Sequence, residues 1–129
     1  MIYMEAYIKA ISYYLPEKII TNDDLVKEFP EWTVDKIASK VGVVERHVVN
    51  DDETAVDLAV KAGEKLFIEH GIDRESIDFI LFCTQSPDYY LPASACVIQE
   101  KLNIPTSIGA LDYIWFIISK RNRSVKNCI

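Results

Sequence analysis

Residues 77–113 constrain the fold more than any other part of the chain. The segment IDFILFCTQSPDYYLPASACVIQEKLNIPTSIGALDY opens with an apolar run, passes through a proline-marked loop and closes with a second apolar run. We expect a strand at 77–84, a helix from about Pro92 to Leu102 and a strand at 107–113. A strand that is apolar on both sides is typical of a parallel sheet covered by helices on both faces. The segment therefore predicts a strand–helix–strand unit.

The remaining residues continue this alternation. The pattern predicts a strand at 6–14, a helix at 23–29 capped by Asn22, a helix at 33–40 closed by Gly42, and a strand at 43–49. A longer helix begins after Thr54, with Asp57 completing a capping box, and ends at Gly71. This order predicts an α/β fold with a mostly parallel, mixed sheet covered by helices and joined by right-handed crossovers.

The composition excludes several classes of protein. The chain has 129 residues, of which 50% are hydrophobic and 26% charged, as expected for one globular domain. A net charge of -6 argues against nucleic-acid binding, and the basic residues near the end of the chain are expected to form a solvated tail. No apolar run approaches the roughly 20 residues of a membrane span, and no signal peptide is recognisable. We expect a soluble, cytoplasmic protein without a nucleic-acid or membrane partner.

Four blocks of the sequence resemble one enzyme family in order and spacing. They are residues 12–17 with 21–25 (SYYLPE and TNDDL), 40–47 (KVGVVERH), 53–59 (ETAVDLA), and the segment 77–113. Each block is short, but four in register resemble the ketoacyl-acyl-carrier-protein synthase III enzymes, a family with a thiolase-like fold.

The resemblance implies an architecture and a chemistry. Residues 1–113 would form the N-terminal half of a thiolase-like fold, an incomplete α/β domain, and two subunits would pair as a homodimer. In the family a cysteine thiolate takes an acyl group from a coenzyme A thioester. A histidine and an asparagine from the second half then help malonyl-acyl-carrier protein attack that acyl group in fatty acid biosynthesis. Acyl-coenzyme A and the carrier protein would be substrates, and no cofactor is implied.

The sequence departs from the family where the nucleophile is expected. The resemblance puts the catalytic cysteine five residues beyond Asp112, and Ile117 occupies that position. An isoleucine side chain cannot be acylated, and no matching histidine or asparagine follows. We therefore expect no catalytic residue and no condensing activity.

Residues 114–129 form a divergent tail. Residues 114–123 can be back-translated with codons that, read one base later, encode a segment similar to the family. A deletion combined with a frameshift is therefore a hypothesis for the origin of the tail.

Two residues are candidates for substrate binding through the resemblance. Lys40 aligns with a basic residue that contacts the coenzyme A nucleotide, and a solvated lysine is the alternative interpretation. Leu91 aligns with a residue that reaches across the dimer into the partner's acyl pocket, and packing under its own loop is the alternative. Trp32 is a weaker candidate for adenine stacking, because its spacing to Gly42 is longer than in the family. Val44 stands where the family usually has a further basic residue.

The cysteines and histidines favour structural roles. Apolar surroundings predict that Cys83 and Cys96 pack in the interior, and Cys128 lies in the tail. His47 is expected to be a structural hydrogen-bonding residue, and His70 to sit favourably at a helix C-terminus. The spacing of these residues does not match a metal site.

Two other functions remain open from the sequence. The chain is alternatively a non-catalytic dimerisation or binding module that uses the family's subunit interface. It is also alternatively a fragment of another thiolase-fold synthase, such as a polyketide or HMG-CoA synthase-like enzyme. Uncovered apolar faces of an incomplete fold would favour assembly into a homodimer in any of these cases.

Overall fold

The computed structural model describes residues 5–113, and the predicted tail at 114–129 lies outside the described residues. The elements are β1 (Lys18–Thr21), α1 (Asn22–Glu28), α2 (Val34–Val41), β2 (Glu45–Val48), α3 (Ala55–His70), the 3-10 turn η1 (Arg74–Ser76), β3 (Phe79–Cys83), α4 (Ser94–Lys101) and β4 (Gly109–Tyr113). The α/β class is confirmed. Within the described residues the strands form two separate two-stranded sheets, antiparallel β1–β2 and parallel β3–β4.

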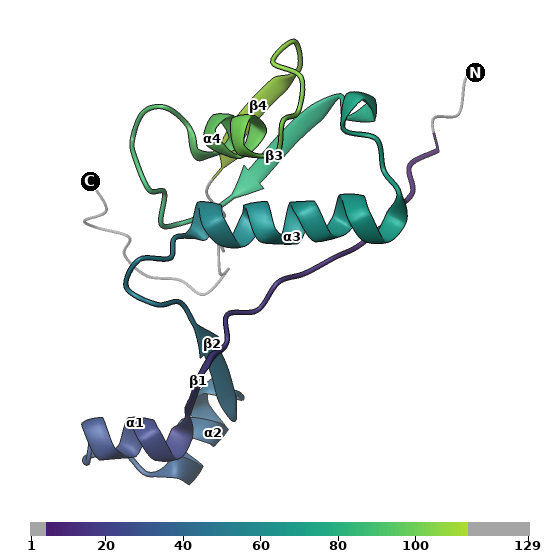
Figure 1. The fold of residues 1–129 in the computed structure, drawn as a ribbon. Coiled ribbons are helices and arrows are strands. Elements are labelled where there is room, and N and C mark those ends of the chain that lie inside the picture. Colours follow the sequence, from purple (N-terminus) through teal and green to yellow (C-terminus); the bar gives the residue numbers. More distant parts are fainter. Residues whose placement is uncertain (1–4, 114–129) are drawn as a thin grey trace, which may run out of the picture.

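The larger of two packing units, called the core unit here, consists of α3, α4, β3 and β4. Its centre is a cluster of buried apolar side chains contributed by α3, α4 and the turn after α4: Val56, Phe67, Ile98, Leu102 and Ile104. Gly63 lets the two helices approach closely, since a Cβ atom at that position would lie 2.7 Å from Cδ1 of Leu102. The long helix α3 runs beneath α4 and the parallel strands (Figure 1).

The parallel sheet of the core unit is covered on one face only. Ile80 and Phe82 point inward and pack against the buried cluster. Phe79, Leu81 and Cys83 alternate with them and are exposed on the outer face. The prediction that helices cover both faces is therefore wrong for the described residues, because both helices that pack on this sheet do so from the inner side.

The smaller unit, called the small unit here, consists of β1, α1, α2 and β2. The prediction of Asn22 as the cap of α1 is wrong, because the hydroxyl of Thr21 accepts the N–H of Asp24 at 3.2 Å and completes a capping box. Asn22 is instead buried. Its amide donates to the carbonyl of Val43 at 2.9 Å, and its side-chain oxygen accepts from Arg46 at 2.7 Å.

Residues 6–14 do not form the predicted strand. The segment runs along the outside of α3 without strand pairing (Figure 1). Side chains hold it there: Lys61 donates to the hydroxyl of Tyr14 at 3.2 Å, and Lys65 lies 4.7 Å from the ring centroid of Tyr13. Strand β1, which pairs with β2, begins only at Lys18, after Pro16.

The local signals at helix ends predicted the boundaries well. Thr54 and Asp57 form the expected capping box at the start of α3. Gly42 and Gly71 end α2 and α3 in the left-handed conformation, with φ of 71° and 59°. The helix expected from Pro92 begins at Ser94, two residues later, after a cis peptide bond between Leu91 and Pro92.

Candidate functional site

Asp112 on β4 caps helix α4 across the core unit. The backbone N–H groups of Ser94 and Ala95 donate to its two carboxylate oxygens, each at 2.6 Å. The helix has no cap of its own, because Ala93 at the N-cap position lacks a polar side chain. A carboxylate at a helix N-terminus is also stabilised by the helix dipole. The end of β4, from which the family's nucleophile loop is expected to continue, is thereby fixed against α4.

The sequence did not reveal this role of Asp112. In the sequence, Asp112 was only the reference point for locating the expected nucleophile at position 117. Its hydrogen-bond partners lie 17 and 18 residues away along the chain. A signal was nevertheless present. One carboxylate stands in an otherwise apolar strand, and the helix that precedes the strand begins at Ala93 without a capping side chain.

The carboxyl ends of β3 and β4 place Cys83 beside Tyr113. The two residues are paired in register, and a hydrogen bond with the Cys83 thiol raises the pKa of the Tyr113 phenol. Cys83 and Cys96 are both exposed, so the prediction that they pack in the interior is wrong. Cys83 is exposed because it points to the uncovered outer face of the sheet, and Cys128 lies outside the described residues.

Lys40 and Trp32 come together on the small unit. The ammonium group of Lys40 lies 5.3 Å from the centroid of the Trp32 ring, and that of Lys36 lies 6.0 Å from it. Trp32 also borders an apolar hollow of about 310 Å³, lined by Leu25, Phe29, Trp32, Ile37 and Val41. An aromatic ring flanked by two cations suits a ligand with a flat ring and anionic groups. Val44, where the resemblance expects a further basic residue, is exposed and carries no charge.

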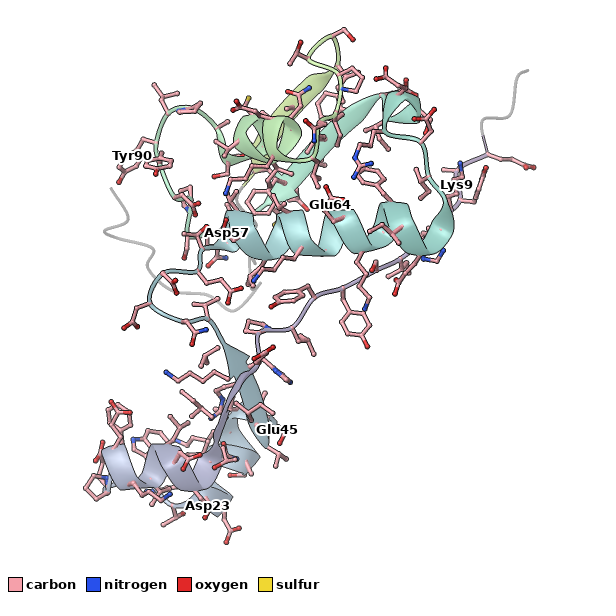
Figure 2. All side chains as sticks on the ribbon, in the orientation of Figure 1. Lys9, Asp23, Glu45, Asp57, Glu64 and Tyr90 are labelled. Atoms are coloured by element: carbon pink, nitrogen blue, oxygen red, sulfur yellow. The ribbon has the colours of Figure 1, made fainter. Side chains whose placement is uncertain are left out.

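Leu91 lies in a loop that projects into solvent. It is 87% exposed and its neighbour Tyr90 is 99% exposed, so Leu91 does not pack under its own loop. Figure 2 shows Tyr90 pointing away from the rest of the molecule. The loop before α4 and helix α2 belong to different packing units, so within one chain Leu91 and Lys40 do not form a common site (Figure 1).

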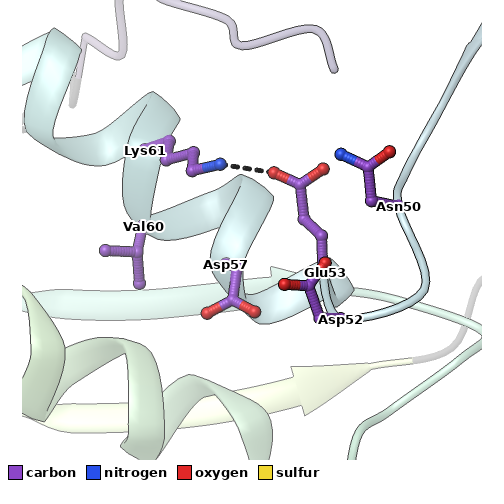
Figure 3. Close-up of a pocket in the computed structure, with 6 residues that line it drawn as sticks. All are labelled: Asn50, Asp52, Glu53, Asp57, Val60 and Lys61. Atoms are coloured by element: carbon purple, nitrogen blue, oxygen red, sulfur yellow. Dashed lines mark hydrogen bonds and ion pairs between the residues drawn. The ribbon is translucent and has the colours of Figure 1, made fainter. Parts of the chain in front are cut away.

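A polar hollow of about 370 Å³ lies at the start of α3 and holds several carboxylates (Figure 3). Glu53 is paired with Lys61, an interaction that raises the lysine pKa. Asp57 accepts from Lys101 on α4 at 2.8 Å as well as capping α3. These contacts, that with Lys101 first, lower the pKa of Asp57 to about 2. Glu53, Asp57 and Lys61 are therefore engaged in structural pairs.

The histidines have the structural contacts expected of them. Nδ1 of His47 lies 2.5 Å from the carbonyl oxygen of Pro16, which ties β2 to the segment before β1. Nε2 of His70, in the last turn of α3, lies 3.3 Å from the carbonyl oxygen of Ile11. Residues 5–113 contain no cluster of three or more His, Cys, Asp or Glu side chains that would hold a metal ion.

Within residues 5–113, no helix combines the length and the apolar character that crossing a membrane requires.

Solved structures define the class of protein. A structure titled 3-oxoacyl-(acyl-carrier-protein) synthase III superposes with a TM-score of 0.76 at 45% sequence identity, covering 84% of this chain and 32% of that one. The described residues therefore form part of a thiolase-like fold. No protein-family model matches the chain.

Curated relatives carry the same name. Beta-ketoacyl-acyl-carrier-protein synthase III of Xanthomonas euvesicatoria is 42% identical over 102 residues, and that of a Sulfurovum species is 39% identical over 100 residues; each match covers 77% of this chain. The matched part of the chain is therefore similar to beta-ketoacyl-acyl-carrier-protein synthase III enzymes. It spans 29–30% of the length of these relatives.

Proposed function

We propose that the chain is the N-terminal part of a 3-oxoacyl-acyl-carrier-protein synthase III. Such an acyltransferase condenses an acyl-coenzyme A with malonyl-acyl-carrier protein in fatty acid biosynthesis, and we place it in the cytoplasm. The observation that carries this proposal is the similarity of the chain to these synthases, which reaches 39–42% identity over 100–102 residues. The shared name of the matched relatives favours this synthase over polyketide and HMG-CoA synthase-like enzymes.

Lys40 is proposed to contact the nucleotide part of coenzyme A. Its ammonium group already lies over the face of Trp32, so a bound adenine ring and its phosphates would meet a stacking surface and a cation together. We expect Lys40→Ala to weaken binding of coenzyme A about five- to tenfold, the loss of one partly exposed charge contact. Lys18→Ala on β1 is the matched control, and isothermal calorimetry is the measurement. Equal affinities of the two variants would remove Lys40 from the site.

Leu91 is proposed to reach a second copy of the chain. Its exposure and that of Tyr90 leave a large apolar loop in water, which is characteristic of an interface. We therefore propose a homodimer. Leu91→Asp should shift the chain to the monomer in light scattering at micromolar concentration, whereas Asp88→Asn in the same loop should not. A monomeric wild-type chain would contradict this part of the proposal.

We propose that this chain is catalytically inactive. Ile117 stands where the resemblance expects the cysteine nucleophile, and a hydrocarbon side chain has no lone pair with which to attack a thioester. Intact-mass measurement after incubation with acetyl-coenzyme A is expected to show an unmodified chain. A stable acetyl adduct that disappears in Cys83→Ser or Cys96→Ser would overturn the inactive assignment.

The division at residue 113 is part of the same proposal. Residues 1–113 are taken as the incomplete thiolase-like domain and 114–129 as a divergent tail. The encoding DNA tests the frameshift hypothesis directly. A family-like reading frame downstream of the Asp112 codon is expected in a shifted phase, and its absence would eliminate the hypothesis.

A second candidate is a non-catalytic dimerisation or binding module. The observation that favours it is the bare outer face of β3–β4 together with the exposed loop at Tyr90. This alternative predicts assembly without any affinity for coenzyme A, whereas the synthase proposal predicts both. Calorimetry with coenzyme A and light scattering on the same preparation distinguish the two functions.

A further inference from the structure

Two short connections join the small unit to the core unit. Residues 14–17 lead from the segment along α3 into β1, and residues 49–54 lead from β2 into α3 (Figure 1). In the part of the chain that the structure describes, the extensive contacts between helices and strands all lie within one unit or the other. The orientation of the small unit on the core unit therefore depends on how these two connections are held.

One side chain contacts both connections. The ammonium group of Lys61, in the second turn of α3, donates to the hydroxyl of Tyr14 at 3.2 Å and lies 4.7 Å from the centroid of that ring. The same ammonium group forms a hydrogen-bonded ion pair with the carboxylate of Glu53 (Figure 3). Tyr14 belongs to the first connection and Glu53 to the second, so Lys61 holds the two connections together on α3.

The burial of Glu53 makes this contact difficult to replace. Only 11% of the Glu53 side chain is exposed, against 47% of the Lys61 side chain. A mostly buried carboxylate without a cation partner is costly, and its ion-pair partner in the described chain is Lys61. Lys61 lies at the surface of α3 and outside the buried apolar cluster. Its removal should therefore affect the connections and leave the core unit folded.

The first connection is also fixed at its other end. Nδ1 of His47 on β2 lies 2.5 Å from the carbonyl oxygen of Pro16, and the pairing of β1 with β2 begins shortly after. Only Leu15 separates the residue held by Lys61 from the residue held by His47. While Lys61 is in place, the first connection therefore has little length over which the small unit could rotate.

We propose that Lys61 fixes the orientation of the small unit on the core unit by bridging the two connections. The hollow beside Trp32 lies on the small unit, and the carboxyl ends of β3 and β4 lie on the core unit. The bridge therefore also sets the separation of these two surfaces. Without it the small unit would reorient about its connections while both units stay folded, as in a hinge motion.

Residual dipolar couplings of the backbone amides test this proposal, because they report the orientation of each unit in one common frame. In the native chain a single alignment tensor should describe both units. Lys61→Met keeps an unbranched apolar side chain and removes the ammonium group. We expect the alignment tensor of the small unit to become about twofold smaller than that of the core unit, because independent motion averages its couplings. The couplings of α3 and α4 should still share one tensor.

Lys65→Met is the matched control. Lys65, one turn further along α3, donates to the carbonyl of Tyr13 and lies over its ring, and its contacts in the described chain do not reach the second connection. This variant should keep the common tensor. Glu53→Gln keeps the shape of the side chain and removes its charge, so it should loosen the small unit as Lys61→Met does. It decides the question alone if Lys61→Met does not fold.

Three results would overturn the proposal. The first is a common tensor for both units in Lys61→Met and Glu53→Gln. The second is a pair of unequal tensors already present in the native chain. The third is equal loosening in Lys65→Met, because the whole segment along α3 would then hold the small unit and the bridge would not.

Discussion

The core unit and the small unit have similar elements but are held together by different forces. In the core unit the side chains of α3 and α4 interlock around Phe67 and Leu102 in a buried apolar cluster. In the small unit the buried side chains are Ile37 and Asn22, and Asn22 bridges the start of α1 to the backbone at Val43 and to Arg46.

This difference suits the core unit to be a stable scaffold and the small unit to present a binding surface. Apolar packing is non-directional and proportional to buried area, so the core unit gains from its length and its many contacts. The small unit depends on a few directional bonds, and its apolar side chains around Trp32 line an open hollow instead of a core. A hollow left unfilled within a marginally packed unit is suited to a ligand, which would add the missing contacts.

The largest loss of stability should come from shortening a buried side chain in the core unit. Phe67→Ala removes a buried ring from the centre of the cluster and is expected to lower the free energy of unfolding by about 3–5 kcal/mol. Ile68→Ala, one residue along the same helix but 77% exposed, should stay within about 0.5 kcal/mol of the wild type. Chemical denaturation measures both. Similar losses from the two substitutions would mean that the cluster is not the source of stability.

The next effect should come from the cap that joins β4 to α4. Asp112→Ala leaves the N–H groups of Ser94 and Ala95 without their acceptor, and we expect a loss of about 2–3 kcal/mol. Asp112→Asn keeps one acceptor oxygen and should lose about half as much. Hydrogen exchange of the first turn of α4 reports the effect locally. Unchanged protection in Asp112→Ala would show that the carboxylate is not the cap.

A smaller and more local effect is expected in the small unit. Asn22→Ala removes the bond to the Val43 carbonyl and the acceptor of Arg46, at a cost of about 1–2 kcal/mol. Hydrogen exchange should accelerate in α1 and β2 and remain unchanged in α3. Asp23→Asn, at the neighbouring exposed position, is the control. Loss of protection in both units together would contradict their separation.

The smallest effect is a pH dependence at Asp57. Its folded-state pKa is lowered to about 2, so its contribution to stability is present above the unfolded pKa near 4 and is lost as pH falls from about 4 to about 2. The difference in stability between the wild type and Asp57→Asn should therefore shrink over that interval. Thermal unfolding between pH 7 and pH 2 measures it. Lys101→Met should weaken the pH dependence, because Lys101 is the largest cause of the shift.

Short-range signals made much of this fold predictable. Thr54 with Asp57, and the glycines at 42 and 71, fixed helix ends because each capping interaction joins residues only a few positions apart. Strand β1 was missed because its four residues, Lys18–Thr21, show no alternation of apolar and polar side chains. The predicted strand at 6–14 has the right residue types but pairs with no strand of the described chain, because side-chain contacts hold the segment along α3.

The candidate site was predictable only in part. Lys40 and Leu91 came from the family resemblance, and their roles stay predictions until ligand binding and assembly are measured. The capping role of Asp112 and the exposure of Cys83 depend on tertiary packing. An apolar strand appears the same in sequence whether one face or both faces are covered.

Turnover of malonyl-acyl-carrier protein tests the central claim most directly. The purified full chain is incubated with acetyl-coenzyme A and malonyl-acyl-carrier protein, and 3-oxoacyl product is quantified against a reaction without protein. A synthase segment with isoleucine at position 117 predicts no product above that background. Product that scales with the amount of chain and disappears in Cys83→Ser or Cys96→Ser would contradict the account.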